Sequence, residues 1–208
     1  MNWKPEVLEE NGYALFETLP HAELLGFLKK HKSIKNRYSY AFLIFNLLFF
    51  LLGVSYSYWL VRTEQMRFGD VFSYLSYGIS ISILLIPFHE YLHVLAYRSQ
   101  GAKQTSLSAN WKRFYFMALA HRFVANQKEF IIVALTPFAV ITSLALLGLL
   151  LGDSTFKLVF LGLLIVHTAM CSGDFSLLKF LEYHKKDEVL TYDDAENKIS
   201  YFFRRRMN

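Results

Sequence analysis

The stretch LLIPFHEYLHVLAYR, residues 84–98, places two histidines and a glutamate inside an apolar run. Its Leu, Ile, Phe and Tyr residues are typical of the inner part of a membrane-spanning helix, yet His89, Glu90 and His93 lie within five residues. An ion at the centre of a bilayer costs on the order of 2.5–3.5 kcal/mol on insertion scales. The three groups therefore need a compensating partner, which a metal ion or a water-filled cavity containing one would supply.

The whole chain has the composition of a membrane protein. It has 208 residues, of which 54% are hydrophobic and 19% are charged, whereas about 25% of residues are charged in soluble domains. The formal net charge is +5, and the basic run Arg204–Arg206 is typical of a juxtamembrane segment that contacts anionic lipids, so we expect no nucleic-acid partner. The single Cys171 excludes an internal disulfide framework. The first residues lack the basic and apolar regions of a cleaved signal peptide.

Four apolar segments are long enough to cross the roughly 30 Å hydrocarbon core, which takes about 20 residues as a helix. They cover residues 38–61, 71–97, 130–151 and 156–178. Lys and Arg are frequent before the first span, in the connector 98–129 and after the fourth span, and they are sparse in the other two connectors. Because basic residues favour the cytoplasmic side, we expect both termini and this connector to be cytoplasmic.

The predicted fold class is an all-α membrane protein with about four transmembrane helices. Residues 1–37 are expected to form a cytoplasmic amphipathic segment, residues 38–182 a four-span domain, and residues 183–208 a cytoplasmic basic tail. In the connector 98–129, two stretches of strand-like composition, about 104–109 and 114–120, favour a small β-hairpin around Asn110 and Trp111 over a pair of amphipathic turns.

Residues 20–32, PHAELLGFLKKHK, predict a short amphipathic helix. The helix either lies on the membrane surface, with its lysines toward the lipid headgroups, or packs on the soluble face of the protein itself. Its inward-facing residues would be Leu24, Leu25, Phe27 and Leu28.

The pattern H-E-x-x-H predicts a zinc site on the second span. His89 and His93 are four residues apart, so a helix places both imidazoles on one face, where they can bind one tetrahedral metal ion. Glu90 is the expected general base, as in zinc metalloproteases with this pattern. A solvated polar face is the alternative for a soluble helix, but the cost of polar groups in an apolar span weakens it.

A zinc site needs a third protein ligand. His167, Cys171 and Asp174, near the end of the fourth span, are spaced by four and three residues and fall on one helical stripe. Depth favours Asp174, because His167 lies about 10 Å further toward the outer face, away from the level of His89 and His93. Cys171 and His167 remain alternatives, and a helix cap is another interpretation of Asp174.

Other residues have less specific signals. Pro137, inside the third span, leaves a backbone carbonyl without its helical partner and predicts a kink or a path to the site. His121, Asn126 and His167 are candidate oxyanion donors that the sequence does not place. The edge of the predicted hairpin is a candidate surface for an extended substrate, which would bind as an added strand.

The order of four motifs resembles a known family. HEYLH on a membrane helix, a short basic segment, LTPF in the next span and SGDF on a later helix resemble the bacterial zincin-peptidase membrane proteins, over residues 80–182. They resemble the site-2 intramembrane metalloproteases more distantly, because in that family a Leu-Asp-Gly segment supplies the third ligand, whereas here Gly173 precedes Asp174 and Phe175 follows it. The resemblance implies Zn²⁺-dependent hydrolysis of peptides within or beside a bacterial cell membrane.

Two other classes of protein fit part of the sequence. A non-catalytic membrane regulator or scaffold that retains the HExxH motif would be insensitive to Glu90→Gln. A haem-binding bundle would also use histidines, but it would leave Glu90 unexplained. The predicted function is therefore that of an integral-membrane zinc metallopeptidase that acts on a peptide substrate near the cytoplasmic side. The sequence does not specify the substrate or the oligomeric state.

Overall fold

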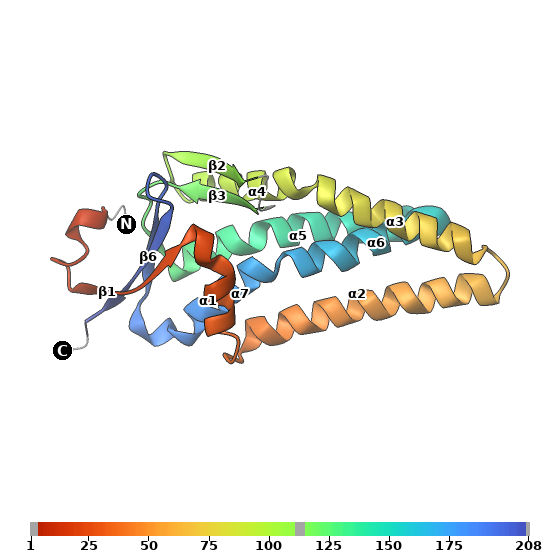
Figure 1. The fold of residues 1–208 in the computed structure, drawn as a ribbon, viewed down its shortest axis with the longest axis horizontal. Coiled ribbons are helices and arrows are strands. Elements are labelled where there is room, and N and C mark those ends of the chain that lie inside the picture. Colours follow the sequence, from red (N-terminus) through yellow and green to blue (C-terminus); the bar gives the residue numbers. More distant parts are fainter. Residues whose placement is uncertain (1–3, 111–114, 207–208) are drawn as a thin grey trace. The chain divides into compact units, whose positions relative to one another are not determined.

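The computed structural model describes residues 4–110 and 115–206 of the chain, and these residues are mostly helical (Figure 1). They also contain a four-stranded sheet and a two-stranded sheet, both antiparallel. The predicted all-α class is therefore incomplete. The chain divides into two compact units, each assembled from separate segments: unit 1 contains Met1–Tyr38, Glu90–Thr136 and Gly173–Asn208, and unit 2 contains Ser39–His89 and Pro137–Ser172.

The predicted spans coincide with helices. Helices α2 (Arg37–Arg62) and α5 (Gln127–Leu151) are each long and apolar enough to cross a membrane. The second and fourth predicted spans are bent pairs: α3 (Phe68–Leu84) and α4 (Ile86–Ser99) meet at 45°, and α6 (Ser154–Met170) and α7 (Ser172–Tyr183) meet at 44°. The described chain thus has two candidate spans, or four if each bent pair is one span, which is consistent with a membrane protein.

Both bends have a local cause. Pro87 has no N–H, and its ring clashes with the carbonyl four residues earlier, so α3 ends at Leu84 and α4 begins at Ile86. At the second bend, Ser172 and Gly173 form the kind of Ser/Gly pair at which helices commonly kink. Each bend starts a new helix close to a polar residue singled out by the sequence.

Within unit 2, α3 and α6 lie side by side with their backbones in close contact (Figure 1). A Cβ added at Gly78 would lie 2.0 Å from a carbonyl oxygen of α6, and one added at Gly162 would lie 2.3 Å from a carbonyl oxygen of α3. The Ser82 hydroxyl donates a hydrogen bond to another carbonyl of α6 at 3.0 Å. Small residues that allow such close approach are a usual means of helix association in membranes.

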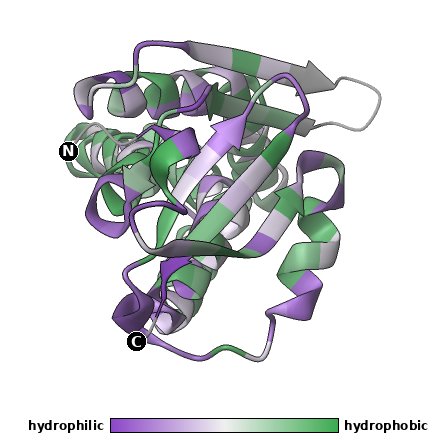
Figure 2. Ribbon diagram, turned by 90° about the vertical axis from the view of Figure 1, so that its left-hand side faces the viewer, coloured by the Kyte–Doolittle hydropathy of each residue, from purple (hydrophilic) through white to green (hydrophobic). Residues whose placement is uncertain are grey.

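Unit 1 contains the four-stranded sheet, in the order β1 (Tyr13–Pro20), β6 (Ile199–Arg205), β5 (Leu190–Asp194) and β4 (Ala125–Asn126). The N-terminal and C-terminal segments, expected to be an amphipathic segment and a basic tail, supply three of these strands. Figure 2 shows that the strands carry both hydrophobic and hydrophilic residues. In β6, Phe202 and Phe203 are buried in two separate hydrophobic clusters, one on each face of the strand.

The helix expected within residues 20–32 is α1 (Leu24–Lys30). Phe27 is buried in the hydrophobic cluster of unit 1, and Leu24 and Leu28 pack against that cluster. Leu25, which was expected to face inward, is 74% exposed. These contacts favour the interpretation in which the helix packs on the protein itself. Short 3-10 turns are found at Pro5–Val7, His21–Glu23 and Lys185–Asp187.

The hairpin expected in the connector is confirmed. Strands β2 (Thr105–Asn110) and β3 (Tyr115–Ala120) pair antiparallel, with Leu107 opposite Ala118. The hairpin packs against α4, because Ala120 shares a small hydrophobic cluster with Ala96 and Tyr97. Trp111, expected at the turn, lies outside the described residues.

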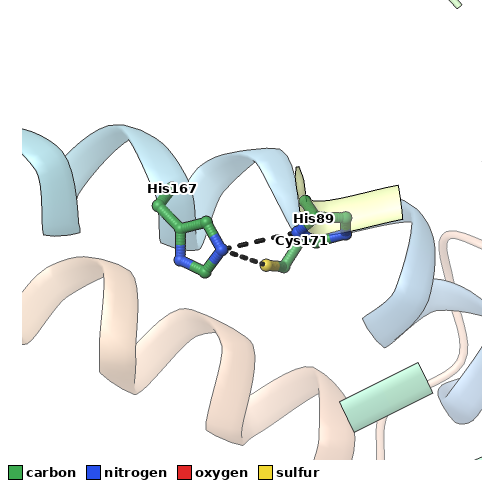
Figure 3. A group of neighbouring side chains, drawn as sticks. All are labelled: His89, His167 and Cys171. Carbon is green, nitrogen blue, oxygen red and sulfur yellow. Dashed lines mark hydrogen bonds between the residues drawn. The ribbon is translucent and has the colours of Figure 1, made fainter. Parts of the chain in front are cut away.

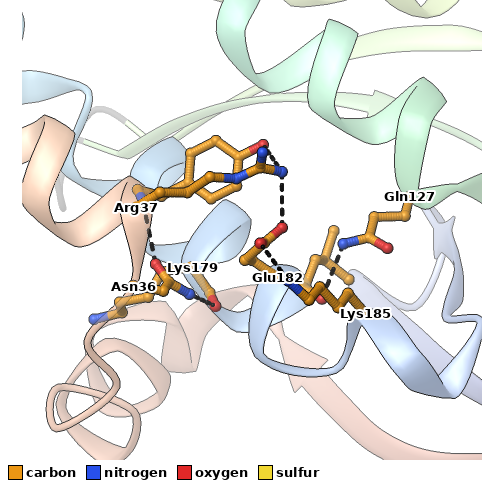
Figure 4. A network of polar contacts seen from close by, with 8 residues as sticks. Asn36, Arg37, Gln127, Lys179, Glu182 and Lys185 are labelled. Carbon is orange, nitrogen blue, oxygen red and sulfur yellow. Dashed lines mark hydrogen bonds and ion pairs between the residues drawn. The ribbon is translucent and has the colours of Figure 1, made fainter.

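The end of α7 is fixed by side chains from two other helix starts (Figure 4). Asn36 donates a hydrogen bond from Nδ2 to one carbonyl near the end of α7 at 2.8 Å, and Gln127 donates from Nε2 to another at 3.1 Å. Arg37 forms an ion pair with Glu182 at 2.8 Å. The Leu181 carbonyl lies in the last turn of α7, where carbonyls have no partner within the helix. Together these contacts hold α7 against the starts of α2 and α5 within unit 1.

A polar chain of His21, Ser200 and Asp193 lies in unit 1. The Ser200 hydroxyl donates to Asp193 Oδ1 at 2.6 Å and lies 3.2 Å from His21 Nε2. Burial lowers the pKa of His21 to about 4, and the charge of Lys198 contributes to this shift. Burial raises the pKa of Asp193 to about 6, although hydrogen bonds to its carboxylate oppose the shift.

The close contact between α3 and α6 predicts that added side-chain volume destabilises unit 2. We expect Gly78→Ala and Gly162→Ala each to destabilise the protein by about 1–3 kcal/mol, because a backbone atom blocks the new methyl group. Gly69→Ala on α3 is the matched control, since no atom lies within 4 Å of its added Cβ. Thermal unfolding in detergent measures the three variants. Equal melting temperatures for all three would contradict the proposed packing constraint.

The polar chain predicts opposite pH dependences for two variants. Folding lowers the pKa of His21, so acidification from pH 6.5 to about 4 favours the unfolded state. Folding raises the pKa of Asp193, so acidification from about pH 6 to 4 favours the folded state. Asp193→Asn should therefore lose stability on acidification, and His21→Gln should gain it, by on the order of 1–3 kcal/mol relative to each other. Thermal unfolding between pH 4 and 7 tests this, and parallel curves would contradict it.

Candidate metal centre

Helix α4 carries the three polar residues of the H-E-x-x-H pattern. His89 and His93 are both 7% exposed. One potential ligand atom from each of His89, Glu90 and His93 lies within 4.8 Å of the other two. The helix thus brings together the residues that the spacing predicts, and their roles as ligands and base remain a prediction.

The orientation of His93 leaves one ring nitrogen directed toward a carboxylate. Its Nδ1 lies 2.9 Å from the carbonyl oxygen of Val133, and since a carbonyl oxygen only accepts, Nδ1 carries the proton. Its Nε2 lies 3.2 Å from Asp174 Oδ1. Two ligand atoms each about 2.0–2.2 Å from a tetrahedral zinc are about 3.4 Å apart. The spacing between His93 and Asp174 therefore fits a shared Zn²⁺.

Pro137 explains why the carbonyl of Val133 is suited to accept this proton. Pro137 lies inside α5, and a proline supplies no N–H to the carbonyl four residues before it, which is that of Val133. The carbonyl instead accepts from His93. Metal-binding histidines usually donate their second ring N–H in this way, which fixes the tautomer and the ring orientation.

Glu90 is held at the edge of the hairpin. Its Oε2 accepts a hydrogen bond at 2.8 Å from the backbone N–H of Ala118 in β3. This N–H points away from β2, the paired strand, toward Glu90. The carboxylate of the predicted base therefore lies beside β3, on the side away from β2.

The alternative third ligands gather around the other histidine of the pattern (Figure 3). His167 Nε2 lies 3.4 Å from His89 Nδ1 and 3.8 Å from Cys171 Sγ. All three residues are buried within unit 2. The structure thus places Asp174 beside His93, and places His167 and Cys171 beside His89.

Two candidate oxyanion donors have other contacts. His121 Nδ1 accepts from the N–H of Ala195 at 3.2 Å, next to the sheet of unit 1. Asn126 Oδ1 accepts from the backbone N–H groups of Lys128 and Glu129 and so caps the start of α5. Among the described residues, neither His121 nor Asn126 has a contact that assigns it to the candidate metal centre.

Sequence reasoning missed the two backbone groups that orient the site, the Val133 carbonyl and the Ala118 N–H. Backbone groups have no signature in side-chain patterns. Pro137 was the one signal available for Val133, since it determines which carbonyl loses its helical partner. Nothing in the sequence indicated that Ala118 would face Glu90.

Comparison with known proteins identifies a family. A family model described as "Putative zincin peptidase" matches residues 82–189, which include all of α4, the hairpin, α5, α6 and α7. No curated protein and no solved structure matches the chain. The family description supports metallopeptidase activity and zinc as the metal. The more distant likeness to site-2 proteases remains a prediction.

The hydrogen bond between His93 and Val133 predicts a role for Pro137 in metal affinity. Pro137→Ala restores an N–H that competes for the Val133 carbonyl, so the zinc affinity should fall about tenfold or more, as is typical when such an orienting partner is lost. Thr136→Ala is the control, because the Thr136 hydroxyl bonds a different carbonyl, that of Ile132. Competition with a fluorescent zinc chelator measures both affinities. An unchanged affinity in Pro137→Ala would show that the proline acts only on helix shape.

Proposed function

The chain belongs to this zincin peptidase family, and we propose that it is an integral-membrane zinc metallopeptidase that hydrolyses peptide bonds in or near the membrane, on the cytoplasmic side. The observation that carries the proposal is the orientation of His93. Its Nδ1 is engaged by Val133, and its Nε2 faces Asp174 at a separation that fits a metal ion.

We assign His89, His93 and Asp174 as the zinc ligands. Two imidazoles and one carboxylate form a common donor set of catalytic zinc sites, which keep a further position for water or substrate. Zn²⁺ in such a set supplies a Lewis acid that polarises a carbonyl and lowers the pKa of water. The cost of burying three ionisable groups among apolar helices supports this assignment, because a cation offsets it.

Glu90 is the general base of the proposed reaction. Its carboxylate takes a proton from the attacking water and later delivers it to the leaving amine, so that water is added across the peptide bond. Its hydrogen bond to Ala118 keeps the carboxylate close to the edge of β3.

The edge of β3 is the proposed surface for the substrate. A peptide must be extended for cleavage, and an extended peptide can bind along the edge of a strand through backbone hydrogen bonds. The bond from Ala118 places this edge within reach of the base. The partner expected on this basis is therefore a membrane or membrane-proximal peptide, in a bacterial cell membrane.

The proposal is tested by separating metal binding from catalysis. The full chain is purified in detergent, and zinc per chain is measured by plasma mass spectrometry. We expect about one zinc in the wild type. In a Cys171→Ser background, which removes the thiol beside His89 and His167, we expect loss of zinc in His93→Ala and Asp174→Ala, and retention in Glu90→Gln. Hydrolysis of a quenched fluorescent peptide library should fall by at least 10²-fold in Glu90→Gln, the scale of general base catalysis.

Glu129→Gln is the matched control for Glu90→Gln. Glu129 accepts from a backbone N–H through the same Oε2 atom, at the start of α5. It should keep both zinc and hydrolysis. If Glu90→Gln cleaves peptides as fast as the wild type, or if the folded wild type takes up no zinc, the catalytic proposal fails and a non-catalytic regulator or scaffold is favoured.

A further inference from the structure

A second group of potential metal ligands shares His89 with the proposed zinc site and differs from it in chemistry. His89, His167 and Cys171 each offer one ligand atom, and these atoms all lie within 4.8 Å of one another (Figure 3). Their exposed fractions are 7%, 1% and 0%. The group comes from α4, from α6 and from the residue at the bend after α6, all within unit 2.

Two separations within this group match those of ligands on one metal ion. Two nitrogens bound to a tetrahedral metal are about 3.3 Å apart, and a nitrogen and a sulfur are about 3.6 Å apart. The observed separations are 3.4 Å between the His89 and His167 nitrogens and 3.8 Å between His167 Nε2 and Cys171 Sγ.

Hydrogen bonding satisfies this arrangement less completely than a metal ion. The same atom, His167 Nε2, faces both His89 Nδ1 and Cys171 Sγ. A ring nitrogen has either one proton or one lone pair, so it makes one good hydrogen bond and leaves the second contact weak. A cation among the three atoms contacts all of them at once.

We propose that His89, His167 and Cys171 form a second, thiolate-containing metal site that binds soft or borderline cations and that excludes metal from the hydrolytic site. Thiolate ligands favour Cu⁺, Zn²⁺ and Cd²⁺, whereas the hydrolytic set of two imidazoles and a carboxylate contains no sulfur. His89 belongs to both sets, and two cations on one imidazole repel each other, so an ion in the second site disfavours an ion in the first. The exclusion rests on the proposed function; binding at the second site does not.

Cobalt titration of the full chain in detergent tests the second site. Cysteine thiolate bound to Co²⁺ produces a charge-transfer band in the near ultraviolet, and the chain has one cysteine, so any such band reports on Cys171. The decisive variant is His93→Ala, which disables the hydrolytic set and leaves the second set intact. We expect the band in this variant on addition of Co²⁺ alone.

Two double variants serve as controls. His93→Ala with Cys171→Ser should have no band, and His93→Ala with His167→Ala should bind Co²⁺ at least about tenfold more weakly. His89→Ala removes a ligand from both sets, so Co²⁺ binding at both sites should be lost. Circular dichroism establishes that each variant is folded. A folded His93→Ala protein with no band at saturating Co²⁺ would overturn the second site.

The same data separate this inference from the proposed function. If wild type and Cys171→Ser bind one Co²⁺ equally well, without a band in either the wild type or His93→Ala, the second site is wrong and the hydrolytic site stands. In the opposite outcome, all bound Co²⁺ shows the band, Cys171→Ser binds no Co²⁺, and His93→Ala still binds it. The second site then stands and the proposed hydrolytic site is wrong.

Discussion

The free-energy cost of placing ionisable side chains among apolar helices governs the arrangement of this protein. Imidazoles, a thiol and carboxylates are brought together where water is scarce, and each needs a partner there. The structure supplies these partners from several sources: a backbone carbonyl for His93, a backbone N–H for Glu90, and a second imidazole for His89. The donor chemistry of the cluster matches a cation, which would offset the cost that remains.

Breaks in helical hydrogen bonding make these partners available. Pro137 frees the carbonyl that orients His93, and Pro87 ends α3 so that the helix carrying His89 starts in a new direction. The bend at Cys171 places Asp174 in the first turn of α7, where the helix dipole favours a carboxylate. Interrupted helices are tolerated at membrane depth where other groups satisfy the freed backbone. The contact between α3 and α6 is achieved differently. There the helices are uninterrupted, and two glycines without side chains let the backbones pack closely.

The features that depend on period and spacing could be predicted from the sequence. Apolar length predicted four segments that each coincide with a long helix or a bent pair of helices. The four-residue spacing of His89 and His93 predicted that their ligand atoms lie close together. The sheet of unit 1 was missed because its strands lie in segments rich in charged residues. The tail of β6, for example, reads as a basic run at Arg204–Arg206, although Phe202 and Phe203 just before it are buried. Pairing between β1 and β6 joins residues nearly two hundred positions apart. Local sequence patterns do not predict such pairing.

Helical spacing alone did not decide whether Asp174, Cys171 or His167 is the third zinc ligand. All three lie on one stripe of an ideal helix, so a straight span would have offered them to the same partner. The bend after Met170 removes this equivalence: Asp174 faces His93, and His167 and Cys171 face His89. Since an imidazole has two nitrogens pointing in different directions, His89 has chemistry available on both sides of its ring. The sequence therefore contains two donor sets that share a residue, where spacing suggested a single set with one uncertain member.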